Sequence, residues 1–173
     1  ISDCDGGLTE WSEIGTFATL SLPPVSYIDE NGQQQLRTKY VTLNGTETTL
    51  GTTGQETWYV ADSTLDYSKT ITLNGDVHLI LKDNATMTVS GGYINGCVPD
   101  PNHGAPEPAY DLNIYGQSTG NDRGSLIVNG SWQAIYCNGI TINGGKVTAT
   151  SGHFMAVAID ANNVTINGGQ VKI

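Results

Sequence analysis

The acidic, basic and histidine side chains are the groups from which an active site would be built, and in this 173-residue chain they form no complete catalytic set. Glycoside hydrolysis requires two carboxylates that face one groove, and a lyase would need clustered carboxylates with a basic proton acceptor. The acids of the strand-rich region are scattered: Asp76, Asp83, Asp111 and Asp160. Arg123 is the only arginine after Arg37. His78 stands between apolar residues of a predicted strand, which indicates that its side chain points outward from the sheet. We therefore predict no catalytic residue and no cofactor, with a polysaccharide lyase or hydrolase as the alternative.

An acidic segment at residues 3–7 and the three cysteines are the residues that could bind a metal ion or form a disulfide. The segment Asp3-Cys4-Asp5-Gly6-Gly7 clusters carboxylates as calcium sites do, but the spacing of a twelve-residue calcium loop is not completed. We interpret it as a solvated acidic end and predict no metal site. The three cysteines cannot all pair within one chain, and Cys97 with Cys137 is the favoured pair because neighbouring coils would bring them together. Sequence carries no bond geometry, so whether that bond forms stays open.

Binding is the chemistry that the chain supports better. Residues 97–110 hold four of the six prolines, which cannot join a sheet interior, so this segment must leave the fold as a loop. Loops on a rigid scaffold are common recognition sites, and aromatic rings suit sugar faces. The candidate ligand-binding residues lie in or near this loop: Tyr110, Tyr115, Trp132, Tyr136, Asp100 and His103. For each aromatic the alternative is core or edge packing, and for Asp100 and His103 it is a plain solvated position.

The net charge and the hydropathy of the chain limit the classes of partner that it can bind. A net charge of −10 disfavours nucleic acid and anionic membranes, because phosphates would be repelled. No apolar run approaches the length of a membrane span, so we expect no membrane insertion.

The candidate binding residues must be positioned by the secondary structure of the chain, and that structure is predicted to be repetitive. Ile140-Thr141-Ile142-Asn143-Gly144-Gly145 recurs 24 positions later as Val164-Thr165-Ile166-Asn167-Gly168-Gly169, without a gap. A fixed period with alternating β-branched residues and Asn-Gly turns is typical of a solenoid built from strands. Earlier copies of the signature are expected at residues 71–75 and 112–116. The sequence thus predicts an all-β, single-stranded, right-handed parallel β-helix, with the hand taken from the rule for parallel crossovers.

The repeat also predicts which side chains are buried and which point outward. Ile140, Ile142 and Val147, with their counterparts Val164, Ile166 and Val171, should form buried stacked rows, while Thr141 and Thr165 point outward. Asn143 and Asn167 should stack as an amide ladder. Residues 56–173 are expected to be the β-helix with a loop inserted at about 97–111. Residues 1–55, with a hairpin around Asp29-Glu30-Asn31-Gly32, are expected to cap its end.

The order of these segments resembles a known family over roughly residues 25–173. It is carried by Tyr27–Gly32, Thr49–Gly54, Trp58–Val60, Thr70–Leu81, Leu112–Ser118, Gly124–Leu126 and the final Ile-Thr-Ile-Asn-Gly-Gly-Lys-Val-Thr-Ala-Thr. These segments are similar to repeat-bearing surface proteins of gut bacteria, known as adhesin-like or carbohydrate-binding β-helix proteins. The chain departs from the family's Ala-Gly-Ile-Gly-Gly-Gly turns at residues 134–137 and 158–161. The resemblance implies a β-helix in an extracellular or cell-surface location.

Together these observations predict a non-catalytic, adhesin-like module that binds a glycan or a host surface molecule, with a structural stalk as a further alternative. Val171-Lys172-Ile173 stops inside a repeat, so we expect either a longer protein or end-to-end self-association through the C-terminal coil.

Overall fold

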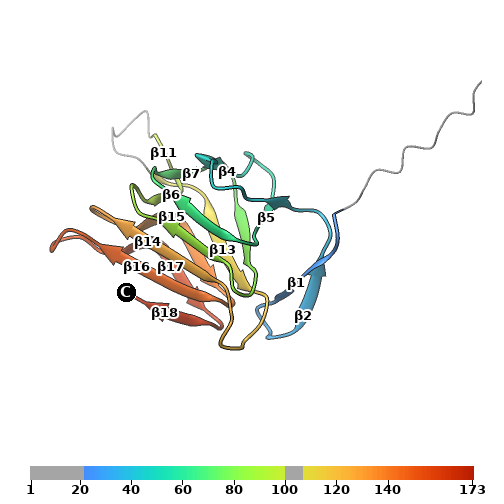
Figure 1. The fold of residues 1–173 in the computed structure, drawn as a ribbon. Coiled ribbons are helices and arrows are strands. Elements are labelled where there is room, and N and C mark those ends of the chain that lie inside the picture. Colours follow the sequence, from blue (N-terminus) through green and yellow to red (C-terminus); the bar gives the residue numbers. More distant parts are fainter. Residues whose placement is uncertain (1–21, 100–106) are drawn as a thin grey trace, which may run out of the picture.

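The computed structural model describes residues 22–99 and 107–173, and in these ranges the chain forms eighteen strands and no helix (Figure 1). Most strands belong to three rows that run along a solenoid of about five turns. Within each row every strand pairs in parallel with the strand one coil away. The predicted parallel β-helix is therefore confirmed, while its right hand stays a prediction.

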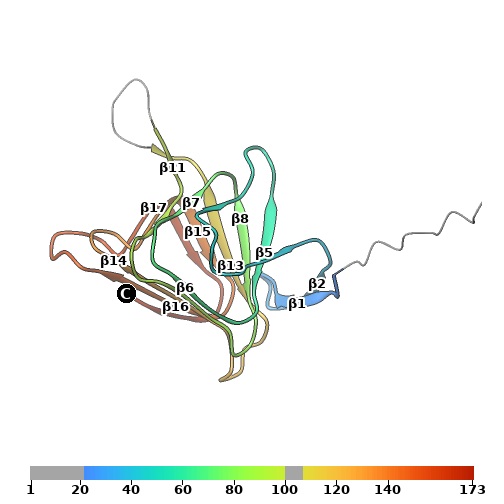
Figure 2. The same ribbon diagram turned by 45° about the horizontal axis from the view of Figure 1, so that its top comes forward.

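The three rows form the sides of the coil, and Figure 2 shows β5, β8 and β13 on a different side from β6, β14 and β16. The first row contains β3 (Val41–Thr42), β5 (Thr57–Ala61), β8 (Val77–Leu81), β13 (Asp111–Gly116) and the second halves of β15 (Ile135–Ile142) and β17 (Ile159–Ile166). The second row contains β6 (Thr64–Tyr67), β9 (Thr86–Val89), β14 (Ser125–Gly130), β16 (Lys146–Ser151) and β18 (Gln170–Lys172). The third row contains β4 (Thr49–Leu50), β7 (Ile71–Leu73), β10 (Ile94–Asn95) and the first halves of β15 and β17.

The interior consists of aligned apolar positions. One such line runs Tyr59, Leu79, Ile114, Ile142 and Ile166, each partnered with the next across a parallel strand pair. The first four of these side chains are at most 8% exposed. Because successive side chains of a strand point to opposite faces, this register sends the residues between them outward.

The earliest copy of the signature was assigned to the wrong side of the coil. Ile71 was expected to correspond to Leu112, but Ile71 pairs with Ile94 in the third row, whereas Leu112 pairs with Val77 and Ile140 in the first. Each side of the coil is a short apolar strand that ends in a turn. A local Ile-Thr-Leu-Asn-Gly match therefore does not say which side it occupies.

The Asn-Gly-Gly turns between the first and second rows stack as predicted. Gly145 and Gly169 have φ angles of +79° and +85°, a region in which residues with a side chain are strained. The Asn167 side-chain amide donates to the Asn143 side-chain oxygen at 2.7 Å, so the amide ladder is confirmed. A second rung joins Asn162 to Asn138 at 3.1 Å.

The last coil differs from the prediction in its burial. Ile140, Ile142 and Val147 are at most 1% exposed, as expected, and Thr141 and Thr165 lie on the outward register. Val164 and Ile166, however, are 53% and 54% exposed, and Val171 is only partly buried. The expectation of full burial was wrong because, among the described residues, β17 pairs only with β15 and β18 only with β16.

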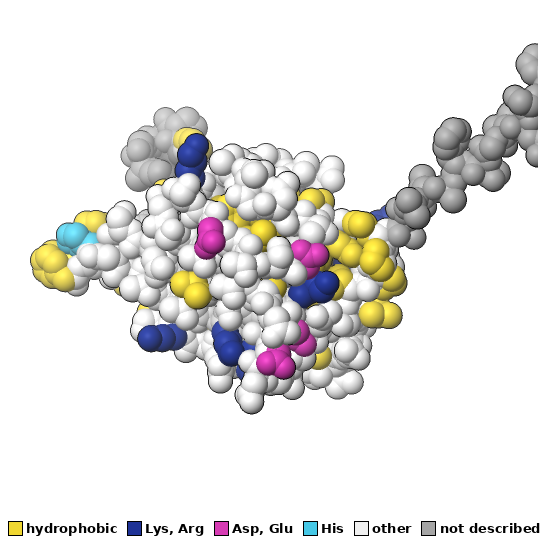
Figure 3. Space-filling model, in the orientation of Figure 1, with side chains coloured by type: hydrophobic (Ala, Val, Ile, Leu, Met, Phe, Trp, Pro, Cys, Tyr) yellow, Lys and Arg dark blue, Asp and Glu magenta, His cyan; other side chains and the backbone are white. Residues whose placement is uncertain are grey.

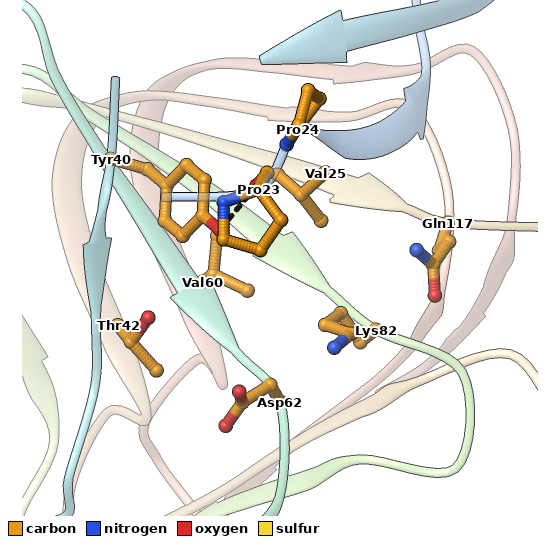
Figure 4. A pocket seen from close by; sticks show the side chains of 9 residues that line it. All are labelled: Pro23, Pro24, Val25, Tyr40, Thr42, Val60, Asp62, Lys82 and Gln117. Carbon is orange, nitrogen blue, oxygen red and sulfur yellow. Dashed lines mark hydrogen bonds between the residues drawn. The ribbon is translucent and has the colours of Figure 1, made fainter. Parts of the chain in front are cut away.

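The N-terminal hairpin covers a side of the solenoid instead of its end. β1 (Val25–Ile28) and β2 (Gln34–Arg37) pair antiparallel, which confirms the hairpin around Asp29–Gly32. Val25 packs with Trp58, Val60, Ile80 and Tyr115, which are outward residues of the first row. Figure 4 shows the segment before β1 lying over Val60, where the Tyr40 hydroxyl donates to the Pro23 carbonyl at 2.7 Å.

The parallel stacking also begins before the expected boundary at residues 55 and 56. β3 pairs with β5 and β4 pairs with β7, so residues 41–50 already belong to the solenoid. Leu43 and Leu50 are buried in the main core. The inserted loop leaves the coil where it was expected, and its base is the antiparallel pair β11 (Cys97–Val98) and β12 (Glu107–Pro108).

The contrast between Ile142 and Ile166 gives a matched test of this fold. We expect Ile142→Ala to lower the free energy of unfolding by about 3 kcal/mol, because it leaves a cavity in a packed row. We expect Ile166→Ala, at the same register position one coil later, to lower it by less than about 1 kcal/mol. Urea titration of both variants measures this difference, and equal losses would contradict an exposed last coil.

Candidate functional site

The aromatic residues proposed as one binding site do not come together. Tyr115 is 6% exposed and lies beneath the hairpin, and Tyr110 packs against the main core. Tyr136 lies in the third row beside Cys97, at the base of the inserted loop. Trp132, at 54% exposed, is the one member of the set that is largely open to solvent. Asp100 and His103 fall outside the residues that the structure describes.

Tyr115 instead belongs to a buried aromatic cluster that attaches the hairpin to the solenoid. The Trp58 ring stacks on His78 with centroids 4.4 Å apart and on Tyr115 at 5.1 Å, and Tyr27 of β1 contacts both Trp58 and Tyr115 at 5.0 Å. The predicted outward position of His78 is confirmed, but its ring lies against those of Trp58 and Tyr115, and the His78 side chain is only 16% exposed.

Hydrogen bonds fix the orientation of these rings. The Trp58 indole nitrogen donates to Glu56 Oε1 at 2.6 Å, and His78 Nε2 lies 3.5 Å from the same oxygen. The other His78 nitrogen, Nδ1, is 2.9 Å from the Tyr115 hydroxyl. A neutral imidazole with its proton on Nε2 accepts from Tyr115 and donates toward Glu56. Burial raises the pKa of Tyr115 well above its ordinary value, which keeps this hydroxyl protonated as a donor.

A second aromatic group is exposed, at the opposite side of the molecule from the hairpin. The Trp132 ring stacks on His153 with centroids 4.2 Å apart, and His153 stacks on Phe154 at 5.0 Å. Phe154 is 92% exposed and the adjacent Met155 is 74% exposed. Figure 3 shows hydrophobic side chains gathered around a histidine on the loop that projects after β16. We call Trp132, His153 and Phe154 the aromatic platform.

The platform follows from the coil geometry. Residues 131–134 and 152–158 make the same connection, from the second row to the third, on adjacent coils. The Gly152 amide donates to the Gly130 carbonyl at 2.7 Å, which holds the two connections against each other. The Ser151 hydroxyl donates to the His153 carbonyl at 3.0 Å, and the Met155 amide donates to His153 Nδ1 at 3.3 Å. His153 is therefore fixed with Nδ1 as an acceptor, and its neutral form carries a donor at Nε2.

Only Trp132 of the platform was among the expected binding residues. His153 and Phe154 were missed because they lie in a separate loop 21 and 22 positions away along the chain. The second-row strands before the two loops pair at an offset of 21 residues, Ser125 with Lys146. The 24-residue offset of the sequence signature would have placed Trp132 opposite Ala156, so it does not predict the stack with His153.

The cysteines differ from the expectation. Cys97 and Cys137 are both buried and both are free thiols, so the favoured disulfide is absent from this structure. Burial raises the pKa of both thiols, and that of Cys137 rises to about 12. Neither is suited to act as a nucleophile near neutral pH, because the reactive thiolate is scarce.

Two of the acids that look scattered in the sequence lie on adjacent coils. The Asp111 amide donates to Asp76 Oδ1 at 2.9 Å, and the Asn138 side chain donates to Asp111 Oδ1 at 2.8 Å. Within residues 22–99 and 107–173, no three His, Cys, Asp or Glu side chains are placed to share a metal ion. The same ranges contain no helix with the length and hydrophobicity of a membrane span.

Comparison of the chain with protein-family models, with curated proteins and with solved structures finds no match. The geometry of its own residues is therefore the main basis for arguments about its function.

The buried histidine makes the stability of the protein depend on pH. Burial lowers the pKa of His78 below its ordinary value of 6.5, although Glu56 opposes the shift. The unfolded chain then binds a proton more readily than the folded one, so the stabilising contribution is complete above pH 6.5. It is lost as the pH falls through the folded-state pKa.

We expect His78→Phe, which keeps a ring against Trp58, to remove this part of the pH dependence. Urea midpoints of wild type and variant measured between pH 5 and 8 should run parallel above pH 6.5, and the wild type should lose stability relative to the variant as the pH falls below 6.5. Curves that stay parallel down to pH 5 would show that His78 carries the same pKa in both states.

Proposed function

We propose that this chain is a non-catalytic binding module whose β-helix presents the aromatic platform to a glycan. The observation that carries the proposal is the exposed stack of Trp132, His153 and Phe154, drawn from two adjacent coils. Exposed rings of this kind bind the apolar faces of sugars. The His153 Nε2 donor beside them supplies a hydrogen bond to a sugar hydroxyl.

An extracellular or cell-surface location and an adhesin-like role belong to the same proposal. They are supported by the resemblance of the repeat segments to surface proteins of gut bacteria. The ligand would be a glycan, free or displayed on a host surface molecule. A rigid solenoid serves such a role because its loops keep fixed positions while the ligand binds.

The alternative is a polysaccharide-active enzyme, and the adjacent carboxylates of Asp76 and Asp111 are the observation that favours it. Both carboxylates accept structural hydrogen bonds. Measuring reducing-end or unsaturated-product release from the same glycans that bind separates the two functions. Turnover that Asp111→Asn abolishes would favour the enzyme.

Replacing Trp132 tests the binding site. We expect Trp132→Ala to weaken binding of a glycan selected from an array by about tenfold or more, because it removes an exposed ring from the platform and leaves His153 without its stacking partner. Leu36→Ala is the matched control, since Leu36 is 69% exposed on the hairpin, far from the platform. Calorimetric titration of both variants decides the matter. Equal affinities would remove the platform from the site, and a failure of any glycan to bind would leave the stalk as the function.

We further propose that two copies associate end to end through the C-terminal coil. Val164, Ile166 and Ile173 are all more than half exposed there, and Val157 lies along the same hollow as Ile173. The partner that fits is a second copy of the chain, because it presents an apolar end of the same shape. A two-fold arrangement would bury the C-terminal coil of each copy and close the assembly as a dimer.

Association should appear as a concentration-dependent mass in light scattering. We expect the double variant Val164→Ser and Ile166→Ser to be monomeric at concentrations where the wild type is a dimer. The control Leu36→Ser should behave as the wild type does. A monomeric wild type over the whole concentration range would overturn the proposal.

A further inference from the structure

The junction between the hairpin and the solenoid forms an open groove that is distinct from the aromatic platform. It lies between the end of β2 and the start of β5, and its lining includes Arg37, Lys39, Tyr40, Gln55, Glu56 and Trp58. Polar side chains and two aromatic residues therefore surround the same space.

The charge of this groove is unusual for the chain. The protein has 7 lysine and arginine residues against 17 aspartate and glutamate residues. Two of those cations, Arg37 and Lys39, line this one groove. A local positive site on an acidic protein attracts anions that the rest of the surface repels.

Arg37 is held in a position that leaves its binding edge free. Its guanidinium carbon lies 4.5 Å from the centroid of the Trp58 ring, and its Nε donates to the Lys39 carbonyl at 3.1 Å. Among the described residues its two terminal nitrogens have no hydrogen-bond partner, and neither has the Lys39 ammonium. A guanidinium held over a ring, with its two terminal nitrogens available as donors, matches the geometry of a carboxylate.

We propose that this groove binds the carboxylate of an acidic sugar, such as a uronate residue of a polysaccharide. Arg37 would hold the carboxylate through two parallel hydrogen bonds, and Lys39 would add a second charge. Thr52, Gln55 and Thr57 also line the groove, and hydroxyl and amide side chains of these types suit the ring hydroxyls of a sugar.

Glu56 is the one acid among these lining residues, and its position limits its effect. Its Oε1 accepts from the Trp58 indole and faces His78 Nε2. That oxygen is thereby directed at the buried cluster, but the Glu56 side chain is 56% exposed, so part of its negative charge still opposes an anion in the groove. This predicts that neutralising Glu56 strengthens binding.

The test is calorimetric titration at low salt with trigalacturonate and with its methyl ester, which has the same rings but no charge. We expect the acid to bind about tenfold more tightly than the ester, and added salt to reduce the difference. Lys39→Gln should weaken acid binding several-fold, and Glu56→Gln should strengthen it. Lys172→Gln, which removes an equal charge on β18, is the matched control and should change little.

Further variants separate binding in this groove from glycan binding at the aromatic platform. Trp132→Ala should leave trigalacturonate binding unchanged, because the platform is a separate surface. Arg37→Gln should abolish the preference for the acid, and circular dichroism establishes that the variant is folded. Equal binding of acid and ester, equal effects of Lys39→Gln and Lys172→Gln, or tighter binding of a tri-aspartate peptide than of trigalacturonate would each overturn the proposal.

Discussion

The parallel stacking of one coil on the next is the interaction on which the rest of this structure depends. Backbone hydrogen bonds set the spacing of the coils, and aligned apolar side chains such as Leu79, Ile114 and Ile142 fill the interior. Neither contribution suffices alone, because an isolated coil would expose both its apolar cross-section and its strand edges. The exposed Val164 and Ile166 show what a coil lacks when it has a neighbour on one side only.

Both candidate sites are consequences of this stacking. Trp132 and His153 belong to different loops, but the register of β14 on β16 places those loops side by side. The outward side of the first row supplies Trp58, His78 and Tyr115, and the hairpin settles on that aromatic surface. The hairpin in turn carries Arg37 over Trp58. One scaffold thus yields an apolar platform at one side and a cationic groove at the other.

Sequence patterns predicted the parts of the fold in which spacing is regular. The 24-residue offset correctly paired Ile140 with Val164 and Asn143 with Asn167, because no insertion separates these coils. The local signature match failed for Ile71, since the earlier coils differ in length and all three sides share the same alternation. The burial of Tyr115 could not be predicted from its strand alone. Its exposure depends on where a hairpin that is distant in sequence docks, which local periodicity does not encode.

The central claim is that coil stacking gathers sequence-distant side chains into one exposed aromatic platform. The most direct measurement is a nuclear Overhauser spectrum of the protein in solution, which needs no ligand. With ring centroids 4.2 Å apart, the Trp132 indole protons should give strong cross-peaks to the His153 ring protons. The Trp58 indole should give none to His153 and should instead contact His78. Resolved signals without a Trp132–His153 cross-peak would contradict the account.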